Sequence, residues 1–99
     1  MGFRNPVQCR GFTVIRTGMM MLVKYSGNIG NGSWDAVQCE YKLPAELCPP
    51  VEVNAMMCVT NGQTARMLSV NPNGTIRCAN MGAAGSNQNC VGSLCYPIP

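Results

Sequence analysis

The sequence predicts an all-β fold: a small antiparallel β-sandwich or barrel, jelly-roll-like, with about six to eight short strands and no substantial helix. Segments rich in β-branched and apolar residues are separated by Gly, Pro and Asn clusters about eight to twelve residues apart, which is typical of such folds. No amphipathic stretch is long enough for a three-turn helix. The 99 residues make one domain, 1–99, in which 1–11 is expected to be a loosely ordered N-terminal connection.

The first half of the chain predicts strands on either side of a loop. Residues 12–23 form an extended segment that is interrupted at Gly18, and residues 19–25, apolar except for Lys24, indicate a buried strand. A loop rich in Gly and Asn follows at 26–33. Residues 34–43 alternate and predict a strand of mixed environment, which Pro44 ends because proline cannot donate to a ladder.

Residues 51–80 predict a three-stranded meander. The segment 51–60 places only apolar side chains on one face, as a half-buried strand requires. Asn61-Gly62 is a strong hairpin signal, since both residues tolerate positive φ, and residues 71–74 (Asn-Pro-Asn-Gly) predict a second tight turn. After a loop of small residues, 90–98 is expected to be the last strand, with its apolar end docked into the core.

The low content of charged residues and the absence of long apolar runs limit the kinds of partner that we expect for this chain. Charged residues make up 11 % of the chain, against about 25 % in typical domains. Amide, hydroxyl and glycine residues must therefore cover the surface together with leftover apolar area, so we expect self-association. The seven basic residues form no cluster, which argues against nucleic-acid binding. No run of 18 apolar residues exists, so we expect no membrane insertion.

The chain lacks the residues of common catalytic and metal sites. It has no histidine and only four carboxylates, with no pair placed to face each other across a substrate. We therefore expect no enzymatic activity, no cofactor and no metal. The seven cysteines include no Cys-x-x-Cys pair; free core thiols are favoured over a disulfide framework, and zinc is least favoured. No signal-peptide pattern is visible. We therefore expect that the chain is made and used in a bacterial-type cytoplasm, or that it is a piece of a larger protein.

Three features follow one another in the second half of the chain. The first is the segment Leu43-Pro44-Ala45-Glu46-Leu47-Cys48-Pro49, and the second is the meander from Val51 to Cys78 with its Pro-containing turn. The third is the small-residue loop at 82–86, followed late in the chain by Tyr96-Pro97-Ile98. In this order, residues 34–99 resemble the head domain of receptor-binding proteins from siphophages of lactic acid bacteria.

That resemblance implies a β-barrel head that forms a homotrimer and binds host cell-wall polysaccharide reversibly, without catalysis or cofactor. It implies a place in the virion, at the tip of a tail or baseplate assembled in the cytoplasm of the bacterial host. Two alternatives stay open: a purely structural trimeric fibre tip of a virion, and a secreted, disulfide-rich, lectin-like domain.

The resemblance also implies where a saccharide would bind. In such heads the site lies near subunit boundaries, on the strands before and after the Pro-containing turn and on the late loop. The corresponding positions here are Met67, Ser69, Cys78, Ala79, Asn87, Gln88 and Asn89. Well-studied relatives carry His and Asp on the first of these strands and aromatic rings on the second. Because this chain has neither, its ligand differs, its site lies elsewhere, or it binds through loops.

Three further residues are weighed on their own chemistry. Trp34 suits a platform for a sugar ring or a lid on the core; we favour the lid, because tryptophan is mostly buried. Arg66 and Arg77 flank the second turn and suit hydrogen bonding to a phosphate-bearing polymer. Solvated strand positions are the favoured interpretation for both, as for most charged side chains.

Overall fold

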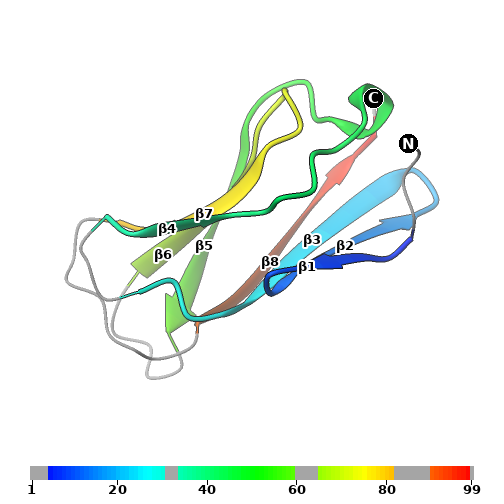
Figure 1. The fold of residues 1–99 in the computed structure, drawn as a ribbon. Coiled ribbons are helices and arrows are strands. Elements are labelled where there is room, and N and C mark those ends of the chain that lie inside the picture. The colour runs from blue at the N-terminus through cyan, green and yellow to red at the C-terminus, as the bar shows by residue number, and fades with distance from the viewer. Residues whose placement is uncertain (1–4, 31–33, 60–64, 82–89, 99) are drawn as a thin grey trace.

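A computed structural model describes residues 5–30, 34–59, 65–81 and 90–98 and confirms the predicted all-β class (Figure 1). Within these ranges the chain forms antiparallel strands and one single-turn 3-10 helix. The elements are β1 (Val7–Cys9), β2 (Phe12–Thr17), β3 (Met20–Gly27), β4 (Ala36–Gln38), η1 (Ala45–Leu47), β5 (Val53–Val59), β6 (Ala65–Val70), β7 (Ile76–Asn80) and β8 (Cys90–Pro97).

The strands hydrogen-bond in the order β1-β2-β3-β8-β5-β6-β7-β4. Among the described residues, strands β5 and β8 share only the pairs Cys58↔Val91 and Val59↔Cys90, whereas β3 and β8 pair along their whole length. The sheet therefore divides into two four-stranded halves, β1-β2-β3-β8 and β5-β6-β7-β4. Figure 1 shows these halves lying face to face, so the fold is a β-sandwich that one narrow junction of strands holds together.

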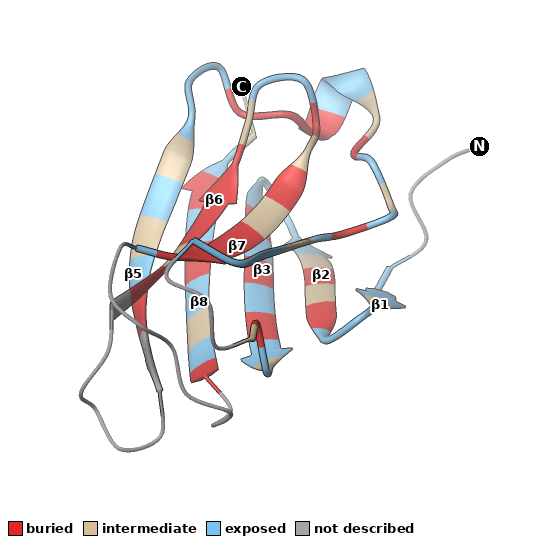
Figure 2. Ribbon diagram, turned by 60° about the vertical axis from the view of Figure 1, so that its left-hand side comes forward, coloured by how far each residue is buried: buried red, intermediate tan, exposed pale blue. Residues whose placement is uncertain are grey.

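The core lies between the two halves. Alternate side chains of β2 and β3 point inward, and burial alternates along the strands in Figure 2. The rings of Phe12 and Tyr25 meet there with centroids 4.7 Å apart, opposite Leu68, Ile76 and other fully buried residues of β6 and β7. Each large apolar side chain buried in this way stabilises the fold by about 1.5–3 kcal/mol.

The structure confirms the predicted meander. Strands β5, β6 and β7 pair in chain order, although the Asn61-Gly62 turn itself lies outside the described residues. In the second turn the N–H of Gly74 donates to the carbonyl of Asn71 (2.9 Å), and Gly74 adopts φ +93°. A Cβ atom at Gly74 would lie 2.7 Å from the carbonyl oxygen of Leu43, so only glycine fits this turn without a shift.

The last strand also docks as expected. The hydroxyl of Tyr96 donates to the carbonyl of Leu47 over 2.7 Å in the buried core, and the N–H of Ile98 donates to the carbonyl of Met19 over 2.8 Å. These bonds tie the end of β8 to η1 and to the turn between β2 and β3.

Three expectations about the first half differ from the structure. Residues 7–9, expected in a loose connection, form β1 and pair with β2. Residues 19–25 are buried on one face only, because only the inner face of each half of the sandwich packs against the core. Met20 and Leu22 lie on the outer face of β3 and are exposed. The strand expected at 34–43 is limited to Ala36–Gln38, because its partner β7 begins at Ile76 and the residues beyond face a turn.

Candidate functional site

The outer face of β5-β6-β7-β4 carries a row of polar side chains that crosses all four strands. Asn54 pairs with Ser69, Ser69 with Arg77, and Arg77 with Gln38. Directly paired residues project from the same face of a sheet, so their side chains are neighbours. The row thus places two amides, a hydroxyl and a guanidinium side by side.

A row of apolar side chains runs beside it. Met56 pairs with Met67, Met67 with Ala79, and Ala79 with Ala36. Each of these apolar residues lies two positions along its strand from a member of the polar row, so the two rows are about 6.6 Å apart. Across the four strands, each row is about 14 Å long. We call these eight residues the two-row face.

The middle of the two-row face is low and its sides are exposed. Ser69 and Ala79, on the central strands, are only 3 % and 8 % exposed although they point outward, whereas Met56 on β5 is 64 % exposed. The Ser69 hydroxyl lies 3.5 Å from the carbonyl oxygen of Arg77, to which it donates. Small side chains in the centre therefore leave the amide, guanidinium and thioether groups accessible around them.

Arg77 is the one charged residue among these eight. Burial raises the pKa of the neighbouring Cys78 thiol to about 12, although the positive charge of Arg77 lowers that pKa. That thiol stays neutral at physiological pH. Chemically, the two-row face can donate and accept hydrogen bonds and contact C–H groups, and it holds no acid–base pair.

The structure brings together part of the predicted site. Met67, Ser69 and Arg77 lie on the two-row face, as does Ala79. Cys78 lies on the inner face of β7 with no exposed surface, because neighbouring residues of a strand point to opposite sides, so it does not belong to this surface. Asn87, Gln88 and Asn89 lie outside the described residues.

Two favoured interpretations of single residues were wrong. Trp34 is 72 % exposed, so it is not a lid on the core; it precedes β4 by two residues. Arg66 is 1 % exposed rather than solvated, because it shares the inner face of β6 with Leu68 and Val70. There its positive charge lowers the pKa of the Cys90 thiol, although burial raises that pKa more.

Sequence reasoning missed half of the two-row face, namely Ala36, Gln38, Asn54 and Met56. The alternation of 51–60 already separates Asn54 and Met56 from the apolar core face. What the sequence did not reveal is the cross-strand register, which aligns these residues with Ser69 and Met67.

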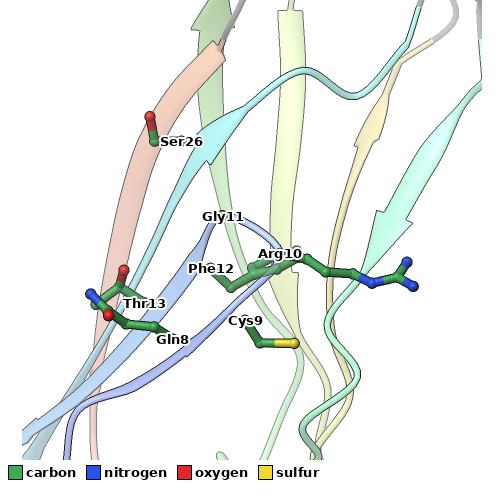
Figure 3. Close-up of a pocket in the computed structure, with 7 residues that line it drawn as sticks. All are labelled: Gln8, Cys9, Arg10, Gly11, Phe12, Thr13 and Ser26. Atoms are coloured by element: carbon green, nitrogen blue, oxygen red, sulfur yellow. The ribbon is translucent and has the colours of Figure 1, made fainter.

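A second surface feature lies at the turn between β1 and β2. It is an open depression of about 420 Å³, lined by Gln8, Cys9, Arg10, Gly11, Phe12, Thr13 and Ser26 (Figure 3). Because it is open and formed largely by one hairpin with a two-residue turn, it encloses little of a ligand. The two-row face is the better candidate site for recognition of a large ligand.

Within the described ranges, no three His, Cys, Asp or Glu side chains are grouped so that they could hold a metal ion. No helix in the described part of the chain has the length and apolarity to cross a membrane. No protein-family model matches the chain, and a search of curated proteins found no match.

Proposed function

We propose that this chain is the receptor-binding head of a bacteriophage tail or baseplate, and that it binds saccharides of the host cell surface as a homotrimer. Binding is reversible and involves no catalysis and no cofactor. The order of segments in residues 34–99 supports the family, and the two-row face supports the chemistry. The head acts in the virion after assembly in the bacterial cytoplasm.

The observation that carries the proposal is the pairing of the polar row with the apolar row. A pyranose ring has an apolar C–H face and an edge of hydroxyl groups. Planar amide and guanidinium groups hydrogen-bond such hydroxyls, and here Asn54, Arg77 and Gln38 supply them in one line. The methionine and alanine side chains of the second row contact C–H groups instead of an aromatic ring. A width of about 14 Å accommodates two or three sugar units.

Arg77→Ala should weaken saccharide binding by about tenfold or more, because it removes charge-assisted hydrogen bonds worth about 1.5–3 kcal/mol. The measurement is titration of the full chain, followed by NMR, with hexoses, N-acetylhexosamines and glycerol-phosphate oligomers from bacterial walls.

Lys42→Ala is the matched control, since it also removes one positive charge, at an exposed residue outside the two-row face. Equal binding by Arg77→Ala and wild type would contradict the proposed site. Absence of binding by the wild type to every probe, with a trimer in solution, would favour the purely structural fibre tip.

Self-association is supported by the outer face of the other half. Ile15, Leu22 and Cys95 form one cross-strand row there, and Thr17, Met20 and Pro97 form the next. With Met19 at the adjoining turn, we call these residues the association face. Met19, Met20 and Leu22 are all exposed, and no residue of the face is charged. Contact with further copies of the chain would remove this apolar surface from water.

Leu22→Glu should convert the trimer to monomer, a threefold fall in mass by light scattering, because it places a charge at the centre of the association face. Val51→Glu, a similar change at an exposed residue outside both faces, should leave the mass unchanged. The exposed Cys95 thiol gives a second readout, since maleimide should label it faster in Leu22→Glu. A wild-type chain that is monomeric at all concentrations would contradict self-association.

A further inference from the structure

The two edge strands of the sandwich, β1 and β4, come together through their side chains. In the strand order each has one hydrogen-bonded neighbour, and no described ladder joins them. The guanidinium of Arg10, just after β1, lies 3.1 Å from the carboxylate of Glu40, just after β4. This exposed ion pair brings the two edges side by side, at a position that we call the seam.

A pair of thiols lies directly beneath that ion pair. Cys9 precedes Arg10 and Cys39 precedes Glu40, and both thiols are free. Cys39 is buried in the core and Cys9 packs against the same core. Burial raises the pKa of the Cys39 thiol, and the nearby Cys9 thiol raises it further. The seam therefore has an ion pair on its outer side and two neighbouring cysteines on its inner side.

One of these thiols is accessible to small molecules. Cys9 lines the open depression at the turn between β1 and β2, and Figure 3 shows Cys9 among the residues that line it. By contrast, Cys48, Cys78 and Cys90 are buried. Cys95 is exposed, but it lies on the outer face of β8, away from the seam.

We propose that Cys9 and Cys39 form a disulfide that closes the seam covalently when the folded protein meets a low-molecular-weight disulfide such as oxidised glutathione. The Cys9 thiolate attacks one sulfur of the small disulfide, whose S–S bond breaks, and one small thiol leaves. Cys39 then loses its proton and attacks the Cys9 sulfur, which releases the second small thiol. The two cysteines lose two electrons and two protons, and the small disulfide is reduced to two thiols.

Closing the seam links residues about 30 positions apart and ties both edge strands of the sandwich together. A cross-link over such a loop lowers the entropy of the unfolded chain. It also prevents β1 from separating from the core while β2 remains in place. This inference concerns the seam alone and does not depend on the proposed function.

The test treats the full chain carrying Cys95→Ser with a mixture of oxidised and reduced glutathione, and with reduced glutathione alone. After alkylation of the remaining thiols, peptide mapping by mass spectrometry should find a Cys9–Cys39 cross-link within one chain. The melting temperature should rise by about 10 °C, and a reducing agent should reverse the rise.

Cys9→Ser and Cys39→Ser, each in the same background, should show neither the cross-link nor the difference between oxidised and reduced samples. The proposal is overturned if the folded protein keeps both thiols at equilibrium with oxidised glutathione. A map that shows Cys78 joined to Cys90 instead would overturn it equally. The map is read on a chain that retains Cys9 and Cys39, so it does not depend on whether the serine variants fold.

Discussion

Raising the pH from about 9 to about 11 should unfold this protein. Burial raises the pKa of Tyr25 and of Tyr96 from 10.0 to about 12. Burial likewise raises the pKa of Cys78 from 9.0 to about 12, and that of Cys39 from 9.0 to about 11. All four groups are neutral acids held in the core, and the Tyr96 hydroxyl donates a hydrogen bond that only its neutral form can make.

The direction of the effect follows from proton linkage. Below about pH 9 these groups are protonated in both the folded and the unfolded chain, and their contribution to stability is fully present. As the pH rises through the unfolded pKa values toward the folded ones, the unfolded chain loses protons first, so the free energy of unfolding falls. Each group contributes up to about 1.4 kcal/mol per pH unit, and together they remove about 7 kcal/mol between pH 9 and pH 11. That loss is comparable with the whole stability of a small domain, about 5–15 kcal/mol.

The measurement is thermal unfolding at a series of pH values with a reducing agent present, so that thiol oxidation does not contribute. Tyr96→Phe is the control variant. It should lose about 1 kcal/mol at neutral pH with its hydrogen bond to Leu47, yet show a shallower fall between pH 10 and 12, because one titrating group is gone. A melting temperature that stays constant up to about pH 11 would falsify this account of the core.

Gly92→Val should destabilise the fold by about 3 kcal/mol, the upper end of the usual range for overpacking. A Cβ atom at Gly92 would lie 2.1 Å from Cγ and 2.9 Å from Cβ of Met57, a residue that is 2 % exposed. These atoms are close to the Met57 backbone, so rotation of the side-chain tip does not relieve the clash. The site adjoins the pairs that join β5 to β8, the narrow junction between the two halves.

Urea unfolding of Gly92→Val, Met57→Ala and the double variant measures this prediction. The larger residue at position 92 should fill part of the space that Met57→Ala leaves, so the double variant should be more stable than the sum of the single changes implies. Ser93→Val, at an exposed position of the same strand, should change stability by less than about 0.5 kcal/mol. Additive costs, or equal stability of Gly92→Val and Ser93→Val, would show that the close packing does not matter.

Local sequence signals were sufficient for most of the strands and turns. The meander, the turn at 71–74 and the last strand appeared where Asn, Gly and Pro interrupt alternating apolar residues. These signals act through the backbone preferences of a few adjacent residues, so one sequence carries them completely. The limits of β4 were not predicted, since they depend on where its partner β7 begins.

The candidate site was only half predicted for the same reason. Ser69, Met67 and Arg77 follow from the strands around one turn, but Asn54 and Gln38 join their row only through the register of neighbouring strands. A shift of one residue in either pairing would turn these side chains to the core. Nor does the residue type reveal the position of Arg66, which is charged and yet buried.

By itself, then, the sequence determined that the chain is all-β, where most turns fall and which residues alternate along each strand. Only the tertiary structure decided which edges meet at the Cys9 and Cys39 seam, and how two rows of side chains align across four strands. The physical reason is range: turn and strand preferences arise between near neighbours, whereas register and the meeting of edges are set by packing between residues far apart in the chain.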